Sequence, residues 1–154
     1  MLATMGRAVA FLAAALVLAY VLWLDQPAIE PRKVLPAYLV AVCAQSVHLV
    51  EEYRAGFYRE FPPILGAAPW SAVAFLLFNV TWLVVFGLVA LGLARRWRPA
   101  ALVALFLALG GGVLNGLAHV ALAIRVGGYF PGLYTAPLVF GAGTYLALRL
   151  LRRS

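Results

Sequence analysis

The fold of this chain is decided by residues 34–53, which read VLPAYLVAVCAQSVHLVEEY. This stretch is mostly apolar and has the length of about 20 residues that a helix needs to cross a membrane. Its last part carries the ionisable residues His48, Glu51 and Glu52. An ionisable side chain costs roughly 2.5–3.5 kcal/mol at the centre of a membrane helix and less near its ends. Three such groups so close together therefore indicate a functional site on a membrane helix.

The spacing within this stretch predicts which side chains share a face. Residues four positions apart on a helix point the same way, so His48 and Glu52 do. Gln45 lies one turn before His48 on that face, and Glu51 lies beside it. The single cysteine, Cys43, points away from this face, and it excludes both an internal disulfide and a cysteine-rich metal site.

Composition extends the membrane interpretation to the whole chain. Of its 154 residues, 66% are hydrophobic and 11% are charged, whereas soluble domains are about half apolar and a quarter charged. The length allows a single domain, residues 1–154. The net charge of +7 comes from basic residues that cluster at the ends of apolar runs. They are expected to set topology and contact membrane lipids, not nucleic acid.

The apolar runs predict an all-α, polytopic membrane bundle of five transmembrane helices. The predicted helices cover residues 8–24, 34–53, 70–94, 100–124 and 136–151. Residues 54–69 contain Pro62, Pro63 and Pro69, which forbid a continuous helix there. We therefore expect an interfacial or re-entrant loop after the second helix, folding back over the helix ends.

The distribution of basic residues predicts the orientation. Five crossings would place four basic residues on one side (Arg7, Arg54, Arg59, Arg125) and eight on the other (Arg32, Lys33, Arg95, Arg96, Arg98, Arg149, Arg152, Arg153). The positive-inside rule puts the larger group and the C-terminus in the cytoplasm, although Arg7 beside the N-terminus argues the other way for the first helix. The many arginines, with the abundant alanine, leucine and glycine, suggest a GC-rich bacterial genome, so the expected location is a bacterial inner (plasma) membrane.

This topology brings distant polar residues to one depth. The second and fourth helices end on the same side, and His48 and His119 lie at similar distances from those ends. Asn115 lies one turn before His119 on its face, and Asn79 of the third helix matches the depth of Asn115. Polar residues from three helices are thus expected to converge in one layer of the membrane.

Three sequence elements occur in order on this scaffold: His48–x–x–Glu51–Glu52, the separate His119, and Tyr129–x–Pro131–Gly132. Together they resemble the HXXEE domain family, small polytopic membrane proteins that are named for the first element. The resemblance runs from the second helix to the start of the fifth. It implies that these residues are the ones to follow, but it supplies no reaction because the family is functionally uncharacterised.

Two histidines with one or two glutamates permit three kinds of chemistry. In the first, His48, Glu52 and His119 bind one divalent metal, zinc or iron, and Glu51 is a general base or an outer residue that orients a ligand. A di-iron centre would need about four carboxylates, more than this region offers. The second is metal-free acid–base catalysis, as in an isomerase or cyclase. The third is non-catalytic proton- or ion-linked transport or binding.

The leading hypothesis is a metal-dependent membrane enzyme that acts on a lipidic or isoprenoid-like substrate. Glu51 and Tyr129 are then the predicted catalytic residues, and Gln45, Asn79 and Asn115 the supporting polar ones. The expected partner is a hydrophobic small molecule. In the metal-free alternative, an isoprenoid or sterol-like substrate would lie in a pocket lined by Phe75, Phe78, Trp82 and Phe86 of the third helix, whose rings would shield a carbocation.

Each of these residues also has a purely structural interpretation. Glu51 and Glu52 could mark the headgroup level and pair with Arg54 or Arg125. Asparagines in membrane helices commonly link one helix to another by hydrogen bonds, and the Gly112–xxx–Gly116 pair allows close helix packing. The Tyr129–Gly132 segment has the composition of a turn.

Overall fold

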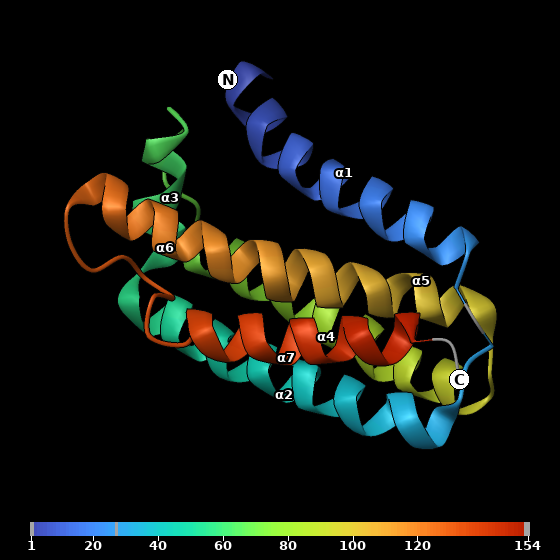
Figure 1. Ribbon diagram of the computed structural model, residues 1–154. Coiled ribbons are helices and arrows are strands. Elements are labelled where there is room, and N and C mark those ends of the chain that lie inside the picture. Colours follow the sequence, from blue (N-terminus) through green and yellow to red (C-terminus); the bar gives the residue numbers. More distant parts are fainter. Residues whose placement is uncertain (1, 27, 153–154) are drawn as a thin grey trace.

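The computed structural model describes residues 2–26 and 28–152, with side chains from residue 13 onward. Its elements (Figure 1) are α1 Leu2–Leu24, α2 Pro31–Ala55, α3 Phe57–Ile64, α4 Ala72–Ala94, α5 Arg98–Phe106, the π-helix η1 Leu107–Leu114, α6 Asn115–Val126 and α7 Ala136–Leu151. The described part contains no strand, so the all-α prediction is confirmed. Arg153, which the charge count includes, lies outside the described residues.

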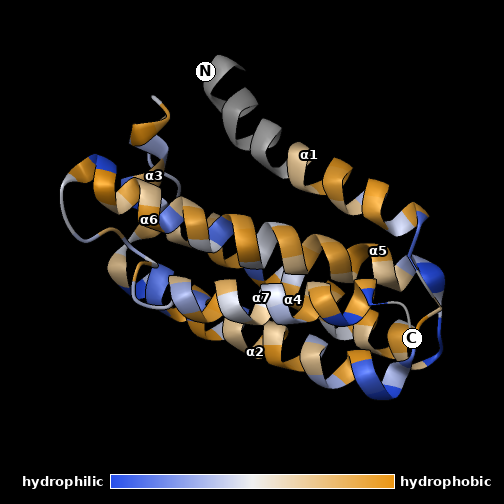
Figure 2. Cartoon of the chain, in the orientation of Figure 1, coloured by the Kyte–Doolittle hydropathy of each residue, from blue (hydrophilic) through white to orange (hydrophobic). Residues whose placement is uncertain are grey.

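Three of the helical stretches are long and apolar enough to cross a membrane: Pro31–Ala55, Ala72–Ala94 and Arg98–Val126. The last of these joins α5, η1 and α6 into one helix of 29 residues. Ala13–Leu24 and Ala136–Leu151 are apolar but shorter. Figure 2 shows hydrophobic residues along the helices and hydrophilic residues gathered mainly toward their ends. The chain has the character of a membrane protein, and five crossings remain a prediction.

Glycines in η1 and α6, which form one continuous helix, bring that helix into backbone contact with α7. A Cβ atom at Gly112 would lie 2.6 Å from the Cα of Gly143, and one at Gly116 would lie 2.8 Å from the carbonyl oxygen of Ala136. Neither position has room for a side chain, so the two helices approach as closely as their backbones allow. The predicted close packing through Gly112 and Gly116 is confirmed, and its partner is α7.

The segment after α2 differs from the sequence prediction, because it contains the short helix α3. Gly56, with φ of 80°, ends α2 and starts α3. Pro62 and Pro63 lie near the end of α3, and the helix stops at Ile64, so the segment is not one continuous helix, as expected. Pro62 has no N–H for the carbonyl of Tyr58, which instead accepts a hydrogen bond of 2.9 Å from the Trp70 N–H. The prolines therefore limit the length of α3 without abolishing it.

One end of the bundle collects the C-terminal ends of α2 and α6, the start of α7, and α3 (Figure 1). Tyrosine and tryptophan side chains occur in these segments and in the connectors that follow α3 and α6, at Tyr53, Tyr58, Trp70, Tyr129 and Tyr134. Such residues are enriched at the boundary between membrane and water. This end thus has the composition of a membrane interface, and the polar site lies just inside it.

Candidate metal centre

Helix α2 places His48 and Glu52 on its buried face, one turn apart. The exposed fraction is 0% for His48 and 6% for Glu52. Glu51, three residues after His48, points to one side of this face, toward the connector from α6 to α7, where its carboxylate contacts Tyr129, Tyr134 and Thr135. The motif spacing therefore sends its two carboxylates to two different surroundings.

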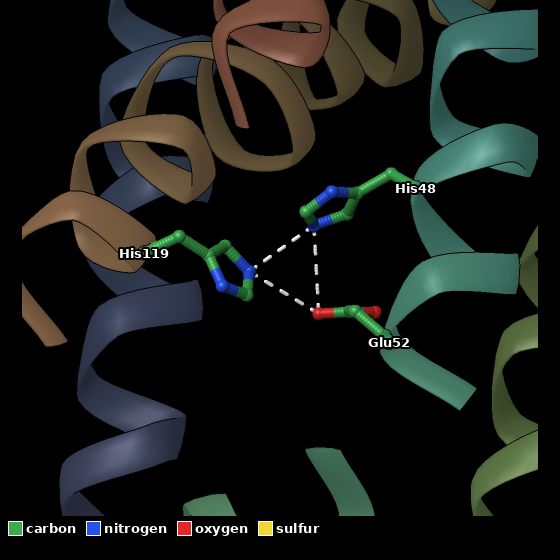
Figure 3. Close-up of side chains that lie close together, drawn as sticks. All are labelled: His48, Glu52 and His119. Carbon is green, nitrogen blue, oxygen red and sulfur yellow. Dashed lines mark hydrogen bonds and ion pairs between the residues drawn. The ribbon is translucent and has the colours of Figure 1, made fainter. Parts of the chain in front are cut away.

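His119 of α6 completes a three-sided arrangement of donor atoms (Figure 3). Its Nε2 lies 3.1 Å from Nε2 of His48 and 3.2 Å from Oε1 of Glu52, and the remaining side, from His48 Nε2 to Glu52 Oε1, is 3.5 Å. His119 is also buried, with 1% of its surface exposed. The structure thus brings together the three residues that the sequence singled out as metal ligands.

The dimensions of this triangle match those of a metal site. Ligand atoms of a tetrahedral zinc ion, at 2.0–2.1 Å from the metal, lie about 3.3 Å from one another. The three measured sides, 3.1, 3.2 and 3.5 Å, bracket that value. Two imidazole nitrogens and one carboxylate oxygen suit zinc and also suit non-haem iron. His48, Glu52 and His119 could therefore hold one divalent ion.

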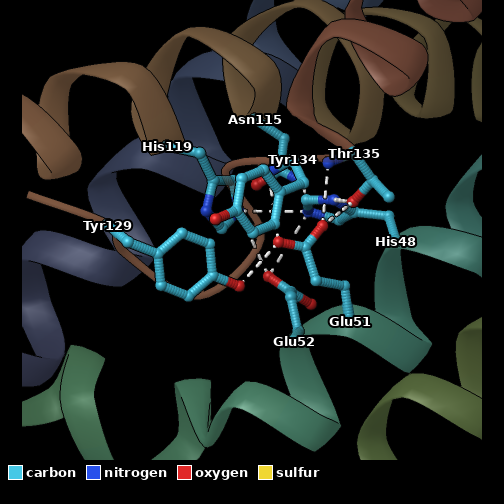
Figure 4. A network of polar contacts seen from close by, with 8 residues as sticks. All are labelled: His48, Glu51, Glu52, Asn115, His119, Tyr129, Tyr134 and Thr135. Carbon is cyan, nitrogen blue, oxygen red and sulfur yellow. Dashed lines mark hydrogen bonds and ion pairs between the residues drawn. The ribbon is translucent and has the colours of Figure 1, made fainter.

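The other ring nitrogen of His48 belongs to a hydrogen-bonded chain (Figure 4). Its Nδ1 lies 2.7 Å from the hydroxyl oxygen of Thr135, which in turn donates to Oε2 of Glu51 at 2.6 Å. Glu51 accepts three more hydrogen bonds, from the backbone N–H groups of Tyr134 and Thr135 and from the Tyr129 hydroxyl. Glu51 therefore anchors the connector between α6 and α7 and reaches His48 through Thr135.

Sequence reasoning did not identify Thr135. It precedes α7, where a threonine is usually interpreted as a helix cap, yet its side chain makes no capping hydrogen bond. Its hydroxyl is used by the site instead. The signal in the sequence is its position, a few residues after the Tyr129–Gly132 segment.

His119 is held in place by packing more than by polar contacts. Its Nδ1 is buried and has no hydrogen-bond partner among the described residues. The ring lies against Gly132, where a Cβ atom would come within 2.3 Å of His119 Cε1. The rings of Phe57 and Phe130 lie with their centroids 5.5 and 6.2 Å from that of His119. Apolar residues therefore cover the outer side of this imidazole.

The three supporting residues predicted from the sequence occupy different positions. The Nδ2 atom of Asn115 lies 3.0 Å from Nε2 of His48, so Asn115 joins the site. Gln45 is half-buried and lies against Gly111 of η1. Asn79 donates to the carbonyl of Phe75 in its own helix. The expected convergence therefore holds for α2 and α6, while the amide of Asn79 bonds within α4.

Charge pairing at the headgroup level does not explain the two glutamates. Within the described ranges, neither Glu51 nor Glu52 forms an ion pair with Arg54 or Arg125.

Tyr129, at the surface end of the network, is 44% exposed. Partial burial, with the hydrogen bond to Glu51, raises the pKa of Tyr129 to about 12. Its hydroxyl therefore remains a proton donor to Glu51 at all physiological pH values.

A separate apolar groove runs along α4. It has a volume of about 420 Å³ and is lined by Leu77, Phe78, Thr81, Trp82 and Val85. Two residues expected to line the substrate pocket, Phe75 and Phe86, are instead buried in the bundle. The physical reason is that they lie on the inward face of α4, where Phe75 contacts Phe57 and the Phe86 carbonyl binds the Tyr38 hydroxyl.

Comparison with known proteins gives one result. A family model described as "Protein of unknown function with HXXEE motif" matches residues 39–147, which include every residue of the polar network. No curated protein and no solved structure matches the chain.

Proposed function

The chain belongs to the HXXEE family, whose function is unknown, and from the geometry of its site we propose that it is a metal-dependent membrane enzyme. In this proposal one divalent ion, zinc or iron, is held by His48, Glu52 and His119. The observation that carries it is the triangle of two imidazole nitrogens and one carboxylate oxygen, 3.1–3.5 Å on a side, in a buried layer.

A three-residue ligand set favours catalysis over a structural role for the metal. Structural zinc sites use four protein ligands, whereas catalytic sites use three and keep a position for water or substrate. The metal would act there as a Lewis acid or would activate water. Glu51 accepts four hydrogen bonds, which leaves it no free lone pair for a substrate proton. Of its two predicted roles, these contacts support the orienting one.

The proposed substrate is lipidic because the site lies in an apolar layer of a membrane-type bundle. The aromatic rings of Phe57 and Phe130 beside His119 offer apolar surface close to the ligands. The groove along α4 could hold an acyl or isoprenoid chain. We further propose that the protein resides in a bacterial inner membrane with its C-terminus in the cytoplasm, an orientation that the eight-to-four distribution of basic residues supports.

One observation favours a second candidate function, proton-linked transport or metal-free acid–base chemistry. Hydrogen bonds lead from buried His48 through Thr135 and Glu51 to the exposed hydroxyl of Tyr129. A chain of this kind can relay protons between a buried site and an interface. Proton-linked uptake into liposomes by a metal-free preparation would favour this second function.

Elemental analysis of the purified protein tests the leading proposal. We expect about one zinc or iron per chain in the wild type and loss of that metal in His48→Ala and His119→Ala. Asn79→Leu is the matched control, since Asn79 bonds within its own helix and should retain the metal. A folded wild-type protein that contains no metal and takes up neither Zn²⁺ nor Fe²⁺ would refute the proposal.

A further inference from the structure

We propose that Thr135 is a positioning residue that, with Glu51, holds His48 in the tautomer with its proton on Nδ1. The Nε2 atom of His48 then carries a lone pair instead of a hydrogen, and a bound metal would replace the Asn115 amide as the partner of that lone pair. The use of this tautomer rests on the proposed metal function, while the tautomer itself is a property of the polypeptide. The inference also gives the two motif carboxylates separate tasks.

The Glu51 carboxylate is saturated with hydrogen-bond donors. A carboxylate has two oxygens with about four lone-pair positions. Four donors surround Glu51: two backbone N–H groups at 3.1 and 2.8 Å, the Tyr129 hydroxyl at 2.7 Å and the Thr135 hydroxyl at 2.6 Å. These four donors occupy the four acceptor positions, so the Thr135 hydroxyl donates its hydrogen to Glu51.

The Thr135 oxygen fixes which nitrogen of the His48 ring carries a hydrogen. A hydroxyl group has one proton and two lone pairs. Since the proton of Thr135 is directed to Glu51, its oxygen can only accept from the ring of His48, whose Nδ1 lies 2.7 Å away. That nitrogen must therefore carry a hydrogen. In a neutral imidazole the other nitrogen, Nε2, is then an acceptor.

An independent contact on the opposite side of the ring agrees with this assignment. The side-chain nitrogen of Asn115, which is a donor only, lies 3.0 Å from Nε2 of His48. A donor at that distance requires a lone pair on Nε2. The two ring nitrogens are thus assigned by separate partners, from α6 and from the start of α7.

The local structure around Thr135 excludes its usual role. Thr135 occupies the N-cap of α7, but its side chain makes no hydrogen bond to the following backbone. Its own N–H is bound to Glu51, so the same carboxylate fixes both the backbone and the hydroxyl. Outer residues that orient metal-bound histidines in this way commonly change metal affinity by about 10–100-fold when they are removed.

The test compares Thr135→Val, which removes the hydroxyl, with Thr135→Ser, which restores it. Thr144→Val is the matched control, because Thr144 lies on α7 and bonds the Phe140 carbonyl of its own helix. Each purified protein is titrated with Zn²⁺ alone, and its histidine tautomers are determined from ¹⁵N shifts in the metal-free state. We expect Thr135→Val to weaken Zn²⁺ binding about 10–100-fold and to lose the Nδ1–H signature of His48. Thr135→Ser and Thr144→Val should resemble the wild type.

The outcomes separate this inference from the proposed function. If no variant, wild type included, binds Zn²⁺ but the Nδ1–H tautomer depends on the hydroxyl at 135, the positioning role is upheld and the metal function fails. If the wild type binds Zn²⁺ and Thr135→Val keeps both its affinity and its tautomer, the positioning role is overturned and the metal function stands. Equal losses in Thr135→Ser and Thr135→Val would also overturn it, since packing and not the hydroxyl would then matter.

Discussion

The Nε2 atoms of His48 and His119, 71 residues apart in the sequence, lie 3.1 Å from each other. The two rings meet edge to face, with an interplanar angle of 83°. At this distance both nitrogens cannot carry hydrogen, so either one proton is shared between them or a cation lies beside both. Oε1 of Glu52, near both nitrogens, supplies the negative charge that a cation there would need.

Gly132 is expected to be essential for the position of His119. Its φ of 96° is strained for any other residue, and a Cβ atom there would overlap the His119 ring. Gly132→Ala should therefore cost roughly 1–3 kcal/mol of backbone strain and also displace the imidazole. We expect a lower thermal midpoint together with weaker Zn²⁺ binding.

Gly127→Ala provides the matched control for Gly132→Ala. Gly127 has a φ of 73°, but a Cβ atom there would meet nothing within 4 Å. It should therefore show the cost of a left-handed backbone, about 1–2 kcal/mol, without a loss of metal affinity. Equal metal binding by the two alanine variants would show that the ring does not depend on Gly132.

A second pair of glycine variants tests the close packing of η1 on α7. Gly112→Ala should destabilise the protein by about 1–3 kcal/mol, because the new methyl group would overlap the backbone of α7. Gly141→Ala, on α7 with open space around it, should be neutral or stabilising by up to about 1 kcal/mol. Thermal unfolding in detergent measures both. A stable Gly112→Ala variant would mean that the two helices are not in backbone contact.

The raised pKa of Tyr129 should make the stability of the protein fall at high pH. Its pKa of about 12 exceeds the ordinary value of 10.0, so its contribution to stability is fully present below pH 10. That contribution should disappear as the pH rises through about 12, where the phenol loses its proton and faces the Glu51 carboxylate. Thermal unfolding of wild type and Tyr129→Phe should therefore differ by a constant amount below pH 10 and converge above it.

Much of the architecture followed from the sequence, because membrane helices need long apolar runs and the end of each run is visible. The proximity of His48 and His119 followed from counting residues to the same end of two helices. Glu52 followed from the four-residue period of the helix. These are local or one-dimensional arguments, and they hold when helices are nearly parallel.

The role of Thr135 and the presence of α3 and of the π-helix η1 could not be predicted from the sequence. Thr135 acts through a connector whose path depends on the turn at Gly132. Helix α3 depends on the contact of the Tyr58 carbonyl with the Trp70 N–H, which compensates for Pro62. Asn79 was expected at the site on the basis of depth alone, but depth does not fix the rotation of a helix about its axis.

The orientation in the membrane is tested by cysteine labelling. On a Cys43→Ser background, Ala68→Cys and Ser154→Cys leave every charge unchanged. The distribution of basic residues predicts that an impermeant thiol reagent applied to intact cells labels the cysteine at 68 and not the one at 154. Labelling of position 154 from outside would reverse the proposed orientation.

The last prediction tests whether Glu52 binds a metal or only stabilises the fold. This carboxylate is 6% exposed, and its Oε1 lies 3.5 Å from Nε2 of His48 and 3.2 Å from Nε2 of His119. Glu52→Gln keeps the shape and an oxygen acceptor but removes the charge that a divalent ion needs. We therefore expect metal content to fall below about a tenth of the wild-type value, while the protein remains monodisperse. Its thermal midpoint should be unchanged or higher, because burying a charge is costly.

Glu60→Gln, on the exposed surface of α3, is the control for loss of one carboxylate and should behave as the wild type does. The critical comparison is between metal content and folding in Glu52→Gln. If that variant keeps its metal but aggregates or unfolds at a lower temperature, Glu52 acts as a structural link between α2 and α6. The carboxylate would then stabilise the histidine pair through hydrogen bonding alone, and the proposed metal site would be wrong.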